Sequence, residues 1–147
     1  MFRGAAALNL DAKGRLAVPS KHRDALQVQS AGRLVMTAHP HRCLLLYPQP
    51  AWVPIEEKIK SFPSFDVTAS AWKRLLLGHA EELEMDGSGR LLVPPVLREL
   101  AGLEKEVRLV GQGDYFELWS KDGWDKQMEQ AFTPGAALPP AFGDFSL

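Results

Sequence analysis

The chain has 147 residues, of which 46% are hydrophobic and 24% charged, with a formal net charge of -1. This composition is typical of a folded protein and does not favour a disordered chain. The apolar runs are too short to span a bilayer, no secretory signal is evident, and one cysteine, Cys43, cannot form an internal disulfide, so we expect a cytoplasmic protein with Cys43 as an inert buried thiol.

The first elements are predicted within residues 8–27. Leu8 and Leu10 alternate with polar residues, which is the period of a half-buried strand. Asp-x-x-Gly at 11–14 is typical of a tight turn, because Asp accepts backbone N–H bonds and Gly adopts positive φ. A returning strand begins at Arg15, Pro19 ends it, and a short helix follows at 20–27.

A β-hairpin and two helices are predicted next. Residues 34–37 pair with 44–47 in the hairpin, and residues 50–60 and 69–77 form the helices. In the second helix Trp72, Leu75 and Leu76 fall at i, i+3 and i+4, a spacing that fits packing on a sheet. We expect these helices to link and cover the two halves of the chain.

The second half repeats the first. At an offset of 75, residues 8–23 and 83–98 agree at eight of sixteen positions, whereas chance gives roughly one. The identical pairs are Leu8/Leu83, Asp11/Asp86, Gly14/Gly89, Arg15/Arg90, Leu16/Leu91, Val18/Val93, Pro19/Pro94 and Arg23/Arg98. A helix at 95–101 and a hairpin of 107–110 with 115–119 complete the second copy, and Trp52 lies over Trp124 at offset 72.

The repeat predicts a mainly β, α+β fold with short helices. One unit has too few strands to enclose a core, so we expect both to form one pseudo-symmetric β-barrel. The predicted segments are a first module at residues 1–52, a helical connector at 53–76, a second module at 77–126 and a tail at 127–147. The tail is expected to be loose from Thr133.

Both units resemble the swapped-hairpin modules of the AbrB-like DNA-binding superfamily, and the whole chain resembles the MraZ family. The residues that carry the likeness are MFRG at 1–4, NLDAKGRLAVP at 9–19, the second motif at 86–94, LVGQG at 109–113 and ELW at 117–119. The likeness covers about residues 1–130, and two correctly spaced Asp-x-x-x-Arg motifs make it specific.

This resemblance implies a sequence-specific transcriptional regulator. By that likeness the chain is a repressor of the bacterial division and cell-wall gene cluster, associated with the nucleoid. It binds short G-rich direct repeats in double-stranded DNA as a homo-oligomeric ring. We expect no cofactor, no membrane association, no small-molecule substrate and no enzymatic activity.

Charge distribution suggests which copy binds DNA. Residues 1–33 carry six basic and two acidic side chains, a local charge of +4, while the rest of the chain has a net charge of -5. Such segregation places a positive face at one end of the molecule, although a solvated chance cluster explains the charge alone equally well. In the second copy Ser88, Val96 and Leu97 replace Lys13, Lys21 and His22.

We therefore predict that the first copy contacts DNA and the second completes the fold. Arg15 is expected to reach guanine from a turn or ribbon in the major groove, while its basic neighbours hold phosphates. The predicted DNA-binding residues are Arg3, Lys13, Gly14, Arg15, Lys21 and Arg23. The structural motif, in which an Asp–Arg ion pair pins the turn, comprises Asp11, Asp86, Gly89 and Arg90.

Other site types are weaker. His39 and His41 lie in a predicted hairpin loop without accompanying Cys or carboxylate ligands, so we predict no metal site. The glycines at 111 and 113 lead into a strand and not a helix, which excludes a dinucleotide fingerprint. Neither catalytic carboxylates nor a nucleophile–base pair is evident. The rival function is an oligomeric β-rich scaffold whose basic end docks an acidic protein.

Overall fold

The computed structural model describes residues 1–133, 135 and 139–145. The first copy contains β1 (Ala5–Asn9), β2 (Arg15–Ala17), α1 (Ser20–Ser30), β3 (Arg33–Ala38), β4 (Leu44–Pro48) and α2 (Gln49–Lys60). After α3 (Val67–Leu76), the second copy contains β5 (Glu81–Glu84), β6 (Arg90–Leu92), α4 (Pro95–Leu100), β7 (Glu106–Gly111), β8 (Phe116–Ser120) and α5 (Lys121–Ala131). A 3-10 helix follows at Pro140–Phe142.

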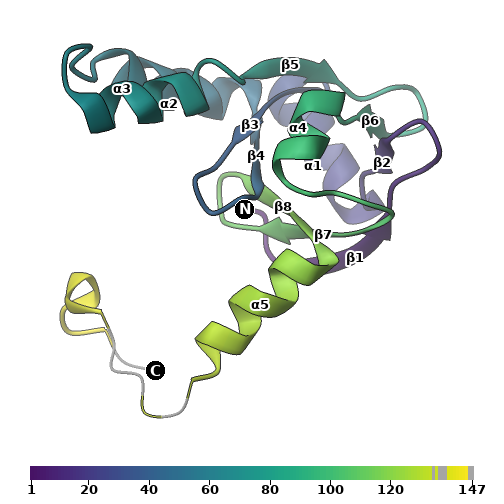
Figure 1. The fold of residues 1–147 in the computed structure, drawn as a ribbon. Coiled ribbons are helices and arrows are strands. Elements are labelled where there is room, and N and C mark those ends of the chain that lie inside the picture. Colours follow the sequence, from purple (N-terminus) through teal and green to yellow (C-terminus); the bar gives the residue numbers. More distant parts are fainter. Residues whose placement is uncertain (134, 136–138, 146–147) are drawn as a thin grey trace.

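The two copies exchange strands. Six strands form an antiparallel sheet in the order β1-β7-β8-β4-β3-β5, and β2 pairs with β6 in a separate two-stranded sheet. The predicted hairpins are confirmed as β3–β4 and β7–β8. In contrast, β1 pairs with β7 of the second copy, and β5 pairs with β3 of the first. The repeats are therefore separate in sequence and interleaved in space (Figure 1).

A pseudo-two-fold axis relates the copies. It passes through the β2–β6 pair, where Leu16 lies opposite Leu91, its own equivalent at offset 75. It also passes through the β4–β8 pair, where Leu45 lies opposite Glu117, its equivalent at offset 72. Each end of the sheet consequently presents an equivalent edge strand, β1 on one side and β5 on the other.

The expected closed barrel is wrong for the described part of the chain. In each copy the turn closes as Asp11 N–H donates to the Arg15 carbonyl and Asp86 N–H to the Arg90 carbonyl, 3.0 and 2.9 Å. Beyond these bonds the strands diverge, because β2 and β6 leave their own neighbours to pair with each other. Since neither β2 nor β6 bridges β1 to β5, the six-stranded sheet stays open.

The core lies between the six-stranded sheet, the β2–β6 ribbon and the helices. Leu16 and Leu91 face inward from the ribbon and are fully buried. They pack in one cluster with Leu26 of α1, Leu97 of α4 and Phe116 of β8. Burial of large aliphatic side chains from both copies explains why neither repeat encloses a core alone.

The helices differ from expectation in three places. α1 continues to Ser30, where Ala31 adopts left-handed φ at 53° and ends it. α5 was not predicted, although Trp124 over Trp52 marks it as the counterpart of α2. Trp72 in α3 is 44% exposed, so only Leu75 and Leu76 of the predicted face pack inward. Figure 1 shows α2 and α3 side by side at one end of the molecule.

The segment predicted as a tail begins inside a helix, because residues 127–131 continue α5. The expected looseness of the tail falls partly on residues 134, 136–138 and 146–147, which lie outside the described residues. Among the residues that the structure describes, each helix is too short or too polar to cross a membrane.

Candidate nucleic-acid interface

The turn at 11–15 is built around the Asp11 carboxylate. One oxygen accepts backbone N–H bonds from Lys13 and Arg15, at 2.9 and 2.8 Å. The other accepts the Arg15 Nε–H at 2.6 Å, forming an ion pair. The backbone bond from Arg15 is the main cause that lowers the pKa of Asp11 below its ordinary value. Asp11 thereby orients both the turn and the Arg15 side chain.

The turn at 86–90 has the same geometry. Asp86 accepts backbone bonds from Ser88 and Arg90, both at 2.9 Å, and pairs with Arg90 Nε at 2.9 Å. Its pKa is lowered, again chiefly by the backbone N–H of the arginine. The Asp–Arg ion pair is therefore present in both copies, between Asp11 and Arg15 and between Asp86 and Arg90.

Each turn glycine is covered by an arginine of the other copy. Gly14 has φ of +83°, and a Cβ there would lie 2.5 Å from Nη1 of Arg98. Gly89 has φ of +74°, and its Cβ would lie 2.5 Å from Nε of Arg23. Both positions need glycine for backbone conformation and for this close approach. The turns are thus locked together across the pseudo-two-fold axis.

Arg15 and Arg90 share one face of the β2–β6 ribbon. Arg15 lies opposite Leu92, and Ala17 lies opposite Arg90. Leu16 and Leu91 alternate with them and face the core, so the four flanking side chains face outward. The two arginines are diagonal neighbours, which places them roughly 7–8 Å apart between Cα atoms. A two-stranded ribbon with two arginines on its outer face is suited to enter a major groove.

The predicted basic residues lie in three places. Lys13 is exposed on the Asp11 turn, next to Arg15. Arg3 is exposed just before β1, and Lys21 Nζ is close to Gly4, 3.1 Å from the position of a Cβ there. Five residues of β1 separate these two sites, roughly 17 Å of strand. Arg23 is half-buried, donates from Nε to the Val18 carbonyl at 2.7 Å and packs on Gly89.

Sequence reasoning missed two features of this surface. Arg90 was placed in the structural motif alone, although it faces outward beside Arg15. Arg98 was not singled out, although it covers the Gly14 turn. The identity of Arg23 and Arg98 in the repeat was the available signal, because each covers the turn glycine that is also kept in the other copy.

The remaining candidates lie in the core or near strand connections. Cys43 is buried, and desolvation raises the pKa of its thiol to about 12. His39 and His41 lie in the β3–β4 turn, and the described residues contain no cluster of three metal-ligating side chains. Gly111 ends β7, and Gly113 lies in the connection to β8.

His22 makes the stability of the fold sensitive to pH. It is 8% exposed and lies edge-on to the rings of Phe2 and Phe116, and burial, followed by the charge of Lys21, lowers its pKa. The unfolded chain therefore binds more protons, and the free energy of unfolding falls as pH drops below the ordinary value of 6.5. We expect His22→Leu, which copies Leu97, to remove this contribution.

Thermal unfolding at pH 7.5 and 5.5 checks this expectation. The native protein should lose more of its melting temperature between these values than His22→Leu, because the acidic side chains titrate alike in both. Equal losses would contradict the role given to His22.

Comparison of the sequence with known proteins identifies one matching family. The family model described as MraZ protein matches residues 1–75 and again residues 76–137. The chain is similar over its full length, and that of the relative, to proteins named transcriptional regulator MraZ. Identity is 63% to the protein of Methylobacillus flagellatus, 57% to that of Dechloromonas aromatica and 55% to that of Aromatoleum aromaticum. These names describe a regulator and not an enzyme, which agrees with the sequence analysis.

Proposed function

The chain belongs to the MraZ family, and from this premise we propose that it is a transcriptional regulator that binds double-stranded DNA through the outer face of the β2–β6 ribbon. The names of its relatives support the regulatory role. The assignment of the DNA-binding face rests on one observation. Arg15 and Arg90 point outward from a two-stranded ribbon, and Lys13 lies beside it.

The geometry of Arg15 supports base recognition. Its Nε is held by Asp11, while no hydrogen bond engages its two terminal amino groups within the described residues. A guanidinium anchored at one side and free at its terminal nitrogens is oriented to donate to O6 and N7 of guanine. Lys13, on the same turn, is placed to contact a phosphate.

The first copy carries most of the binding in this proposal. Lys13 is replaced by Ser88 on the second turn, so only one end of the ribbon has a lysine beside its arginine. Arg3 and Lys21 supply positive charge at the far end of β1, where they extend the contact to phosphates. We assign Arg23 and Gly14 to holding the turn, because both are accounted for by the packing across the two-fold axis.

The resemblance supports a finer proposal. We propose repression of the division and cell-wall gene cluster by a ring of identical subunits, in the cytoplasm at the nucleoid. Head-to-tail subunits in a closed ring match direct repeats, since both lack a local two-fold relation. Several ribbons held at fixed spacing engage several repeats together, so avidity supplies affinity that one ribbon lacks.

The rival proposal is a scaffold that docks an acidic protein without binding DNA. It accounts for the core and for a basic surface. It gives no specific role to the outward pair of Arg15 and Arg90 on a two-stranded ribbon. Binding to DNA and binding to an acidic protein both weaken with salt, so salt dependence alone does not separate the two proposals. A direct test of binding to DNA does.

Gel shifts with DNA carrying one, two or four G-rich repeats, at 50 and 200 mM salt, test the proposal. Phosphate contacts release counterions, so binding should weaken by roughly 10³-fold or more over this range if about six phosphates are contacted. Four repeats should bind far more tightly than one. Equal affinity for one and four repeats would refute avidity, and the absence of any shift at low salt would favour the scaffold.

A further inference from the structure

The sheet ends in two unpaired edges, β1 and β5. On β1, the even-numbered residues face β7: Phe2 and Gly113 exchange two backbone bonds, Gly111 N–H donates to Gly4, and Leu10 N–H donates to Lys105. Because bonding alternates along an antiparallel strand, the backbone groups of Ala5, Ala7 and Asn9 point to the free edge. Their side chains are also exposed.

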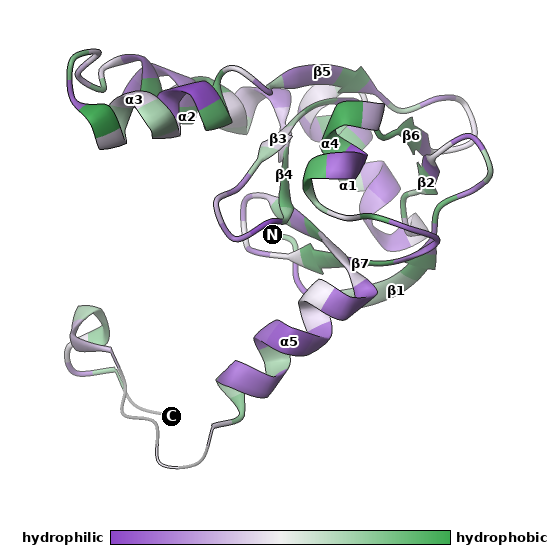
Figure 2. Cartoon of the chain, in the orientation of Figure 1, coloured by the Kyte–Doolittle hydropathy of each residue, from purple (hydrophilic) through white to green (hydrophobic). Residues whose placement is uncertain are grey.

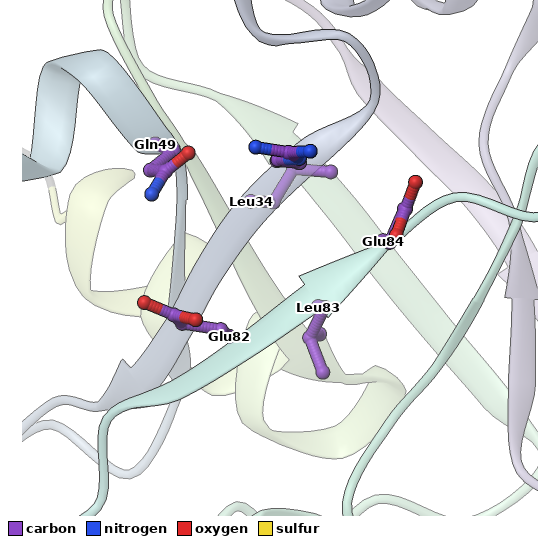
Figure 3. Close-up of a pocket in the computed structure, with 6 residues that line it drawn as sticks. Leu34, Gln49, Glu82, Leu83 and Glu84 are labelled. Atoms are coloured by element: carbon purple, nitrogen blue, oxygen red, sulfur yellow. The ribbon is translucent and has the colours of Figure 1, made fainter.

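β5 has the complementary parity. Met85 N–H donates to Gly32, so the odd-numbered residues face β3 and the backbone groups of Glu82 and Glu84 point outward. Figure 3 shows Glu82 and Glu84 on the strand, with Leu83 between them. Together with Arg33 and Leu34 these residues line a hollow of about 350 Å³.

The two edges differ in chemistry although they are equivalent in the repeat. β5 carries Glu81, Glu82 and Glu84, whereas the strand β1, AAALN, has no charged residue. Figure 2 shows this contrast, with β5 largely purple and β1 largely green. The charges next to β1 are mixed: Arg3 precedes it, and on β7 Arg108 lies opposite Ala7 while Glu106 lies opposite Asn9.

Protection against aggregation does not explain this difference. Charged residues commonly guard a free sheet edge, and the glutamates of β5 fit that role. The same need applies to β1, which is exposed, apolar and unguarded, and whose alanines leave its backbone accessible. An unguarded edge opposite an acidic one indicates that β1 is covered when the protein is assembled.

We propose that β1 of one copy adds to β5 of a second copy as an antiparallel strand. Strand directions alternate across the sheet from β1 to β5, so the addition continues the same pattern. The outward backbone groups lie on odd residues of β1 and on even residues of β5, and in both strands these residues are exposed. Small alanine side chains then lie beside Glu82 and Glu84, and the exposed Arg3 precedes the added strand.

This contact deepens the proposed ring by naming its interface. It is heterologous, so every subunit uses one edge to donate and the other to accept, and the assembly closes or grows as a chain. β1 leads directly into the Asp11–Arg15 turn. The contact would therefore set the spacing between successive DNA-binding ribbons.

Proline substitutions at outward positions test the interface. Ala7→Pro removes an N–H from the β1 edge and Glu82→Pro removes one from the β5 edge, while the internal ladder is retained. Light scattering on the DNA-free protein should show each variant as a single chain of 16.3 kDa, against a multiple of this mass for the native protein and for Ala7→Ser. An equimolar mixture of the two proline variants should form dimers and nothing larger, because each retains one intact edge.

Several results would overturn the proposal: a monomeric native protein, folded proline variants of native mass, or a mixture that stays monomeric. If a proline variant fails to fold by circular dichroism, Glu82→Lys is compared with Glu81→Lys, which changes the same charge at an inward-bonded position. Equal masses for these two would also overturn it. Single-repeat DNA binding by the monomeric variants reports separately on the proposed function, because Lys13 and Arg15 are unchanged.

Discussion

Arg15→Ala is expected to abolish specific DNA binding while the fold is retained. Loss of an arginine that donates two bonds to guanine costs about 1–3 kcal/mol at one site. Because several ribbons bind together, these free-energy losses add. The affinity for a multi-repeat operator should therefore fall at least ~100-fold. Footprinting at fixed salt measures the binding, and thermal unfolding measures the stability, which should change little because the ion pair with Asp11 is exposed.

Arg90→Ala is the matched control. It breaks the equivalent ion pair with Asp86 at the pseudo-symmetric position, so it has the same structural consequence. Since Ser88 replaces the lysine on that turn, we expect a much smaller loss of affinity. A normal footprint with Arg15→Ala would refute its role. Equal losses in both variants would show that the two copies read DNA alike, against the predicted asymmetry.

Leu91→Ala is expected to be the most destabilising of the substitutions considered. Leu91 is fully buried and lies opposite Leu16 on the pseudo-two-fold axis, so its truncation leaves a cavity between the two copies. The free energy of unfolding should fall by about 2–5 kcal/mol. Urea denaturation followed by tryptophan fluorescence measures it, and Leu16→Ala should cost a similar amount.

The neighbouring residue provides the control. Leu92 follows Leu91 on β6, points to the outer face and is 53% exposed. Leu92→Ala should change the free energy of unfolding by less than ~0.5 kcal/mol. Comparable losses from both leucines would show that the ribbon does not face the core as described.

Local features of the fold were predictable from the sequence. The Asp11 and Asp86 turns, the β3–β4 and β7–β8 hairpins and the helices after Pro19 and Pro94 are confirmed. Each depends on residues close in the chain: a carboxylate that accepts nearby N–H groups, a glycine with positive φ, or a proline that ends a strand. The duplication was also visible, because it requires only that two segments of the sequence be aligned.

The candidate site was predictable only in part. Lys13 and Arg15 share a turn, and this followed from their spacing. The burial of Arg23 against Gly89 did not follow, since 66 positions separate them. Arg23 was expected to contact phosphate because it lies near other basic residues in the sequence. In the structure its side chain packs on Gly89 of the other copy.

The sequence alone determined that this protein is a tandem repeat of a β-turn-β unit, that the strand leading into each turn alternates apolar and polar residues, and which copy is more basic. Only the tertiary structure decided that β2 pairs with β6, that β1 and β5 remain edges of an open sheet, and that Arg15 and Arg90 share a face. The physical reason is that alternation specifies the buried side of a strand but not its partner, because backbone donors and acceptors are the same in nearly every residue. The partner is selected by the packing of Leu16 against Leu91 and of both on a common core, a contact between residues that are distant in the chain.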